Sequence, residues 1–290
     1  PMGDDATGAA GEFSNIVGEH DLLTGDAIGP DYAHDEALVG EPVTPRYVAR
    51  PQTAEQVAEL LAAASAAGIP VTARGSGTGL SGAARPHADG LLISFEKMAS
   101  TLEIDTGNQV AVVQPGVTLA DLDTVTAEHG LVYQVFPGEL SASLGGNVAT
   151  NAGGMRAVKY GVTRHNVLGV QAALGTGELI RAGGKITKIS SGYDLTQLII
   201  GSEGTLGLVT EVTLKLYPRL AHSATLLVPF ADLEAITHAV PAVLRTGVDP
   251  NILEYIDSLT LAAIAHAQGL TLGIPADIEQ TAQAYLVIGL

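Results

Sequence analysis

The hydrophobic pattern predicts a strand–helix–strand unit near the start of the ordered part of the chain. Arg46–Arg50 has the apolar positions of a short strand and is closed by a proline. Thr53 is expected to cap an alanine-rich helix, because its hydroxyl can accept a hydrogen bond from a free N–H of the first turn. Gly68 is expected to end this helix, and Ile69–Ala73 returns as a strand. A glycine-rich loop follows directly.

More strands and a second helix are predicted between residues 110 and 216. Val110–Gln114 alternates as a strand, and a threonine cap and a closing glycine bound a helix over Thr118–Gly130. Val167–Ala173 and Glu178–Arg181 flank a Gly-Thr-Gly turn, which is typical of a β-hairpin. Leu206–Leu216 alternates over its whole length and predicts a long strand with one buried face.

The pattern changes near residues 45 and 220, and these two changes divide the chain into three parts. Residues 1–44 are polar, acidic and rich in glycine and alanine, so we expect a partly ordered N-terminal arm with a short helix. Residues 45–220 form the first domain. Residues 221–290 have fewer glycine clusters and predict the opening of a second, α+β domain. Its elements are a strand, two helices and a strand, at Ala224–Val228, Ala231–Arg245, Asp257–Ala267 and Ala284–Leu290.

The last predicted strand, Ala284–Leu290, is apolar and stands at the end of the sequence. We expect its partner strands to lie beyond Leu290, so that the chain holds only the first part of the second domain. Such a strand would present an unpaired edge, which favours association with another chain. A homodimer is therefore one expected state.

Composition narrows the class of protein. Hydrophobic residues make up 46% of the chain, and no apolar run reaches the roughly 18 residues of a membrane span. The net charge of −17 argues against nucleic acid and anionic membranes as partners. The chain has no cysteine, which excludes disulfides, cysteine-ligated iron–sulfur clusters and a cysteine-linked flavin. A cytoplasmic location is expected.

The first glycine segment is Arg74–Gly82, with the sequence Arg-Gly-Ser-Gly-Thr-Gly-Leu-Ser-Gly. Successive free N–H groups in such a loop can form a nest for a pyrophosphate. Gly77, Gly79 and Gly82 also match the spacing of the Rossmann fingerprint, but that motif must open a helix. Pro86 follows too soon for one. The alternatives are a nucleotide-phosphate loop of another kind or an ordinary tight turn.

The second glycine segment is Pro137–Gly154, which is crowded with small polar residues. Hydroxyls and amides at this density can bind phosphate, ribose or the edge of a flavin ring, and a structureless loop this long is uncommon without a function. The third is Lys159–Gly161, where Tyr160 is either a core aromatic or a cofactor contact. The fourth is Gly201–Thr210, which leads into the long strand and by itself also fits a bulged hairpin entry.

Taken together, the four segments resemble the FAD-binding domain of the vanillyl-alcohol oxidase and p-cresol methylhydroxylase (PCMH) superfamily. The branch most similar is the glycolate oxidase, D-lactate dehydrogenase and D-2-hydroxyglutarate dehydrogenase group. Gly192–Leu195 and the Pro115-Gly116-Val117 turn also match the pattern. The resemblance implies an α+β fold, in which a PCMH-type domain of two α/β subdomains precedes an α+β substrate domain.

The resemblance also implies which residues contact the cofactor, mainly through the backbone. The pyrophosphate would be held by Ala73, Arg74, Gly75, Ser76, Gly77, Thr78 and Gly79. The ribityl chain and flavin would be lined by Pro137, Gly138, Glu139, Leu140, Ser143, Leu144, Ala149, Thr150, Asn151 and Ala152, with Gly146, Asn147, Gly153 and Tyr160 as further contacts. The dinucleotide and ring would run past Glu203, Gly204, Thr205, Leu206, Gly207, Leu208 and Val209. Glu203 is expected to shape the loop. No histidine lies between Arg74 and Gly82, so we expect non-covalent FAD.

Catalytic and metal-binding side chains are not evident. The eight histidines show no close pair such as H-x-H, so no metal site is predicted and the catalytic residues are left unassigned. His165 is the nearest candidate by its place beside the third segment. The family's histidine cluster and substrate-binding cations are expected beyond Leu290.

The expected function is FAD-dependent oxidation of a small D-2-hydroxy acid of the glycolate, D-lactate or D-2-hydroxyglutarate class. A hydride would move to the flavin and a base would take the hydroxyl proton. The electron acceptor would be a quinone or an electron-transfer protein. Two alternatives stay open: a flavoenzyme similar to alkyldihydroxyacetonephosphate synthase, which works without net redox, and a flavin-binding subunit without catalysis of its own.

Overall fold

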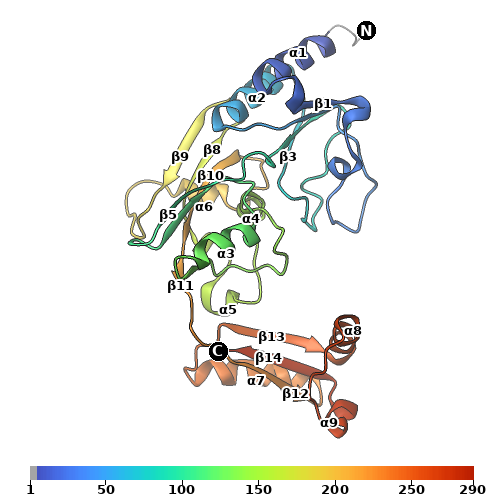
Figure 1. Ribbon diagram of the computed structural model, residues 1–290, viewed down its shortest axis with the longest axis vertical. Coiled ribbons are helices and arrows are strands. Elements are labelled where there is room, and N and C mark those ends of the chain that lie inside the picture. The colour runs from blue at the N-terminus through green and yellow to red at the C-terminus, as the bar shows by residue number, and fades with distance from the viewer. Residues whose placement is uncertain (1–4) are drawn as a thin grey trace. The chain divides into compact units, whose positions relative to one another are not determined.

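The computed structural model describes residues 5–290, which form two compact units. Unit 1 extends to Ala152 and resumes over Val162–Arg219, and unit 2 consists of Gly153–Gly161 and Leu220–Leu290. Both units combine helices with sheets (Figure 1), so the predicted α+β class is confirmed. None of the helices within residues 5–290 is long and apolar enough to cross a membrane.

The first sheet of unit 1 has the strand order β1-β2-β4-β3. It consists of β1 (Leu22–Thr24), β2 (Tyr47–Ala49), β4 (Leu91–Ser94) and β3 (Val71–Arg74), and only β1 is antiparallel to its neighbour. The predicted helix is α2 (Ala54–Ala66), and the Thr53 hydroxyl accepts from the N–H of Gln56 as expected. β2 and β3 are not neighbours, because the unpredicted strand β4 lies between them.

The N-terminal arm is more ordered than its composition suggested. It contains α1 (Asp5–Val17), the short 3-10 turns Glu19–Asp21, Gly25–Ala27 and Pro30–Ala33, and β1. Phe13 of α1 is fully buried and meets the Tyr47 ring edge-on, with the ring centroids 5.5 Å apart. The arm therefore helps to form the core between α1, α2 and the first sheet. The part of the arm prediction that concerns residues 1–4 lies outside the described residues.

The second sheet of unit 1 is antiparallel, with the order β5-β6-β10-β8-β9. Its strands are β5 (Thr101–Asp105), β6 (Val110–Val113), β10 (Leu208–Lys215), β8 (Val167–Ala173) and β9 (Leu179–Gly183). The β8–β9 hairpin and the long strand β10 confirm the sequence predictions. Side chains of α3 (Leu119–Ala127), α4 (Leu144–Thr150) and α6 (Leu195–Ile199) share a core with this sheet.

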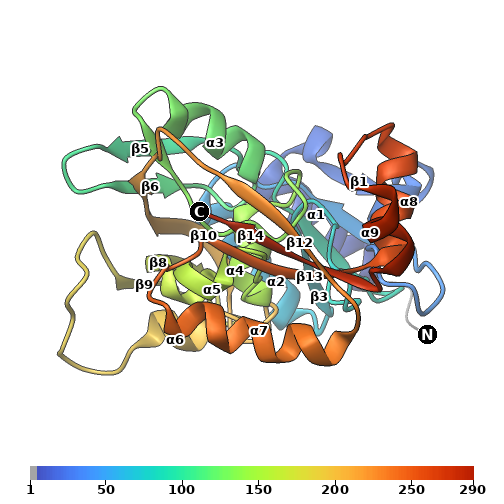
Figure 2. The ribbon, with the colours of Figure 1, turned by 90° about the horizontal axis from the view of Figure 1, so that it is seen from below.

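Shorter elements complete unit 1. β7 (Leu131–Val132) pairs with β11 (Tyr217–Pro218), and a 3-10 turn spans Thr163–His165. A long irregular loop joins β9 to α6, as the yellow segment in Figure 2 shows. The cap predicted at Thr118 is present at the start of α3, where its hydroxyl accepts from the N–H of Asp121 at 3.1 Å, and the Asp121 side chain completes a capping box.

Unit 2 holds a three-stranded sheet with the order β12-β14-β13. Its elements are β12 (Thr225–Phe230), α7 (Leu233–Arg245), β13 (Ile252–Asp257), α8 (Ser258–Gln268), α9 (Ala276–Thr281) and β14 (Ala284–Gly289), with α5 (Ala157–Tyr160) from the inserted segment. Ile236 of α7 and Leu286 of β14 are central to its core.

The prediction that the last strand has an unpaired edge is wrong. β14 is the central strand, hydrogen-bonded along its whole length to β12 on one side and to β13 on the other. The prediction failed because β13 was missed: Ile252–Asp257 alternates only weakly and runs directly into the cap of α8. The strands that pair with β14 therefore lie before it in the sequence.

Candidate functional site

The first and second glycine segments are in direct contact within unit 1. β3 ends at Arg74, and the loop that follows passes close to the start of α4. A Cβ added to Gly75 would lie 1.9 Å from the Ser143 Oγ and 3.8 Å from the backbone nitrogen of Gly146. Only glycine allows the two segments to approach this closely.

The fourth segment is hydrogen-bonded to the second and lies beside the strand end from which the first begins. The N–H of Gly201 donates to the Val148 carbonyl at 3.0 Å, and the N–H of Glu203 donates to the Ala149 carbonyl at 2.9 Å. On the other side, a Cβ added to Gly204 would lie 3.8 Å from the Cβ of Ala73. Three segments far apart in the sequence thus meet at one place, which we call the glycine site (Arg74–Gly82, Pro137–Ala152 and Gly201–Thr210).

Part of the second segment is a helix rather than a loop. Ser143 caps α4 by accepting a hydrogen bond from the N–H of Gly146 at 3.3 Å, and Leu144 and Val148 are buried in the core of the second sheet. The helix ends at Asn151, which has a left-handed backbone (φ +49°) and accepts from the N–H of Arg164. The sequence analysis missed this helix, although a serine directly before Leu144 is a signal that could have found its start.

Backbone strain concentrates in this region. Among described non-glycine residues only four have positive φ, and Asn151 and Glu203 are two of them. Glu203 has φ +51° and an exposed side chain, and its backbone N–H is used to join the fourth segment to the second. Strain of this kind costs about 1–3 kcal/mol and persists at sites that need a fixed loop shape.

The first loop has the features of a pyrophosphate nest. Gly77 has φ +75°, and no helix follows the loop, so the Rossmann interpretation is excluded. Within residues 5–290, no backbone acceptor meets the N–H groups of Ser76–Gly79. The buried Nη1 of Arg74 has no hydrogen-bond partner there either, and its guanidinium lies against Gly77. These free donors suit an anionic ligand.

Unpartnered polar groups also occur in the part of the site that would hold the flavin. Asn147 of α4 is buried, and its Nδ2 donates to no acceptor in the described part of the chain. Leu140 and Leu206 are large apolar side chains that stay 49% and 44% exposed in the second and fourth segments. Orphaned donors together with exposed apolar side chains fit a ligand that has both polar and aromatic parts, so the residues present fit FAD.

Two predicted contacts belong to unit 2. Gly153 and Tyr160 fall in the segment Gly153–Gly161, which clusters with the second unit. There Lys159 forms an ion pair with Asp249 at 2.7 Å and lies 5.7 Å from the centre of the Tyr160 ring. The hydrogen bond with Asp249 raises the pKa of Lys159, so its ammonium stays charged. Their role in binding the cofactor stays a prediction.

Sequence reasoning missed a residue that supports the first loop. Asp35 in the N-terminal arm is 6% exposed, and its Oδ2 accepts from the N–H of Ala84 and lies 3.7 Å from where a Cβ on Gly79 would be. No local pattern marks this role, because the loop residues that Asp35 contacts lie about 45 to 50 residues further along. His165 uses its Nδ1 to accept from the N–H of Val162, a turn-stabilising role. No group of three or more potential metal ligands occurs within residues 5–290.

The sequence of the chain matches known protein families. Residues 45–183 match the family profile "FAD binding domain", and residues 219–290 match "FAD linked oxidases, C-terminal domain". The chain is 65% identical over 278 residues to an uncharacterized FAD-linked oxidoreductase of Mycobacterium tuberculosis, covering 96% of this chain and 61% of that protein.

Two relatives carry more specific names. A D-lactate dehydrogenase of Anaerostipes hadrus is 42% identical, with 81% of this chain and 50% of that protein covered. The glycolate oxidase subunit GlcD of Bacillus subtilis is 40% identical, with 76% of this chain and 48% of that protein covered. The chain thus spans between about half and three fifths of the length of these relatives.

Solved structures show the fold. p-Cresol methylhydroxylase superposes with a TM-score of 0.83 at 21% identity, covering all of this chain and 61% of that one. An alkyldihydroxyacetonephosphate synthase superposes with a TM-score of 0.81 at 19% identity, covering 98% and 56%. The meeting of the glycine segments, the two matching profiles and the named relatives agree: the chain has FAD as its cofactor and belongs to the FAD-linked oxidoreductase family that includes GlcD and D-lactate dehydrogenase.

Proposed function

We propose that this chain provides the FAD-binding part of an enzyme that oxidises a small D-2-hydroxy acid of the glycolate, D-lactate or D-2-hydroxyglutarate class. The observation that carries the proposal is the meeting of the first, second and fourth segments at the glycine site. The printed activities of the relatives, D-lactate dehydrogenase and glycolate oxidase, supply the substrate class. The product would be the 2-oxo acid.

The chain's own contribution is to hold and orient the cofactor. Bound FAD supplies the hydride acceptor for the oxidation. The free N–H groups of Ser76–Gly79 and the Arg74 guanidinium would bind the pyrophosphate, while α4 and the loop at Glu203 would fix the ring end. Orientation matters because a misplaced donor and acceptor can cost several orders of magnitude in rate.

The first test measures the cofactor itself. Because no histidine lies in the first segment, the purified protein should release FAD on heating, without protease. Chromatography of the supernatant identifies the flavin. Release of FMN, or flavin that stays with acid-precipitated protein, would contradict the proposed non-covalent FAD.

The second test measures the reaction. FAD-loaded protein extended past Leu290, to the length of the relatives, is mixed anaerobically with D-lactate, glycolate or D-2-hydroxyglutarate, because the substrate-binding residues are expected there. The absorbance of oxidised flavin is followed, with L-lactate as the stereochemical control. Loss of that absorbance with a D-acid or glycolate, together with formation of the 2-oxo acid, supports the proposal. Retained FAD that none of these acids reduces would instead support a flavin-binding subunit without catalysis. The electron acceptor, a quinone or an electron-transfer protein, is then sought by reoxidation.

The alternative of an ether-lipid synthase gains no support from the structural comparison. The likeness to alkyldihydroxyacetonephosphate synthase stands at 19% identity and shows the fold alone. The two functions differ in net redox, so flavin reduction by a hydroxy acid separates them directly.

A further inference from the structure

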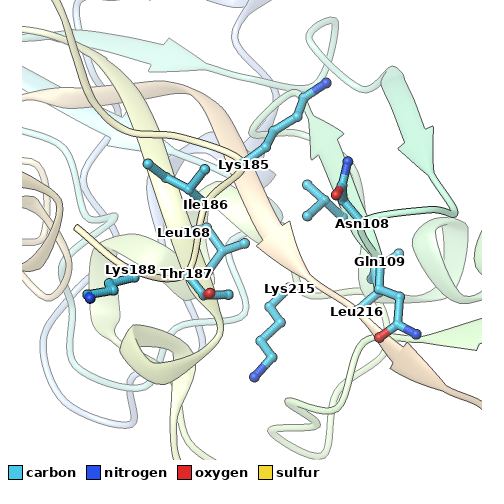
Figure 3. Close-up of a pocket in the computed structure, with 10 residues that line it drawn as sticks. Asn108, Gln109, Leu168, Lys185, Ile186, Thr187, Lys188, Lys215 and Leu216 are labelled. Atoms are coloured by element: carbon cyan, nitrogen blue, oxygen red, sulfur yellow. The ribbon is translucent and has the colours of Figure 1, made fainter.

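A pocket lies in unit 1 at the end of the five-stranded sheet that is far from the glycine site. Its volume is about 520 Å³, within the range of small-molecule sites. The turn between β5 and β6, the loop after β9 and the last residues of β10 line it, as Figure 3 shows. The polar lining side chains are those of Asn108, Gln109, Lys185, Thr187, Lys188 and Lys215.

This pocket is separate from the glycine site. β10 begins at Leu208, inside the fourth glycine segment, and ends at Lys215, which lines the pocket. Seven steps along a strand at about 3.3 Å each put roughly 23 Å between them. None of the residues that line the pocket belongs to a glycine segment.

Positively charged side chains cluster at the pocket, although the protein as a whole is acidic. The sequence has five lysines and a net charge of −17, and three of the five lysines line this one pocket. Lys185 is committed to an ion pair with Glu103. Figure 3 shows its side chain directed away from those of Lys188 and Lys215.

The other two lysines are not neutralised by a carboxylate. Lys188 is exposed and has no partner within residues 5–290. The Lys215 ammonium lies 4.8 Å from the centre of the Tyr217 ring, a contact that leaves its full charge in place. The nearby carboxylate of Asp105 is occupied by hydrogen bonds from Asn108. Two positive charges therefore remain at the pocket.

Uncharged donors complete the lining. The side chains of Gln109 and Thr187 have no hydrogen-bond partner in the described part of the chain. Gln109 also has a left-handed backbone, with φ +55°. A non-glycine residue in this conformation is strained, and such strain clusters at binding sites.

We propose that this pocket binds a small dianion, a dicarboxylate or a phosphate ester, between Lys188 and Lys215. Two ammonium groups match two negative charges, and charge-assisted hydrogen bonds are the stronger kind. Gln109 and Thr187 supply additional hydrogen bonds to the same ligand. The site stands apart from the oxidation proposed above and does not depend on it.

The test is calorimetric titration of FAD-loaded protein with succinate in one arm and inorganic phosphate in the other. Succinate has no hydroxyl group, so it cannot be oxidised as a 2-hydroxy acid at the flavin. Acetate is the monoanion control. Its ionic strength is matched to that of the dianion because salt weakens interactions between exposed charges, with a screening length of about 8–10 Å at 0.1–0.15 M. Binding of either dianion at least about tenfold tighter than acetate is expected, and the arm that binds tighter identifies the ligand chemistry.

Variants assign the binding to the pocket. Lys188→Gln and Lys215→Gln should each weaken the dianion about fivefold or more, and the double variant should abolish the advantage over acetate. Arg245→Gln removes one exposed cation from α7 in unit 2 and should bind as the parent does. FAD content and the thermal midpoint show that each variant is folded. Equal binding of dianion and acetate, or an unchanged affinity in both lysine variants, would overturn the proposal.

Discussion

At one end of the five-stranded sheet β10 starts from a glycine segment, and at the other end it finishes in a pocket lined by lysines. The first end offers backbone N–H groups and close main-chain approaches, with few charged side chains. The second offers ammonium groups on flexible stems. A ligand at the first end is therefore held by the shape of the backbone, and one at the second by charges that salt can screen.

The glycines themselves differ between the two ends. At the glycine site the missing Cβ atoms of Gly75 and Gly77 make room for the Ser143 hydroxyl and the Arg74 guanidinium. Near the lysine pocket Gly183 lets β9 pass close to β8, since a Cβ there would lie 2.1 Å from the Leu168 carbonyl oxygen. The same residue type thus admits polar side chains to the loop at one end and lets two strands pack closely at the other.

The largest effect is expected from Gly77→Val. A β-branched residue disfavours the φ of +75°, and its Cβ would lie 1.8 Å from the Arg74 Nη1. FAD content should fall about tenfold or more, the equivalent of about 1.4 kcal/mol or greater in binding, while the apoprotein stays folded. Absorbance of bound flavin per mole of protein measures it. Gly107→Ala, in the turn at the other end, meets its nearest atom at 3.6 Å and should keep its FAD. If Gly77→Val keeps full FAD content, Gly77 is only a turn residue.

Gly183→Ala tests the opposite end. The substitution brings a Cβ against the backbone of β8 at a φ of +73°, so the free energy of unfolding should fall by about 1–3 kcal/mol. FAD binding to the folded protein should not change. Urea unfolding followed by circular dichroism gives the first quantity and flavin titration the second. Gly175→Ala, which meets nothing within 4 Å, is the matched control. A loss of FAD affinity in Gly183→Ala would remove the distinction between the two ends.

A smaller effect is expected from Ser143→Ala. The variant loses the cap of α4, in which Ser143 accepts from the N–H of Gly146, and this should cost about 1 kcal/mol of unfolding free energy. The loss should also relieve part of the clash in Gly75→Ala, whose Cβ would meet the Ser143 Oγ. A double-mutant cycle of these two positions measures the coupling. Ser190→Ala, at an exposed position in the loop after β9, should be neutral. If the changes in unfolding free energy were strictly additive, the side chains at positions 75 and 143 would not interact.

The smallest effect concerns one carboxylate at each end. Hydrogen bonds from Asn108, and to a lesser degree the charge of Lys185, lower the pKa of Asp105, while hydrogen bonds from Ser141 lower the pKa of Glu139. Because both folded pKa values lie below the unfolded ones, each carboxylate stabilises the fold above its ordinary pKa. That stabilisation is lost as the pH falls through the folded pKa.

Lys185→Gln should therefore raise the pKa of Asp105 and leave that of Glu139 unchanged. A carboxyl NMR titration of the parent and the variant reads the two groups separately. An equal shift at Glu139 would mean that side-chain charge at the lysine end also acts at the glycine site, contrary to the comparison.

Features that depend on neighbours within a few residues were predictable from the sequence. Thr53 and Thr118 cap helices as expected, and the β8–β9 turn follows its glycines. In each case the groups that bond are three or four residues apart, so little chain entropy opposes them and the pattern is written locally. The glycine segments similarly identified the family and the cofactor, because each carries its conformational requirement in its own residues.

Only the tertiary structure decided which strands and side chains distant in the sequence become neighbours. The sequence could not place β14 between β12 and β13, bring Asp35 of the arm to the first loop, or gather Lys188 and Lys215 with Gln109. These partners are separated by about 25 to more than 100 residues, and which of them meet depends on the packing of whole sheets and helices. Any single stretch of the chain is compatible with many such pairings, and only the burial of the complete core selects one of them.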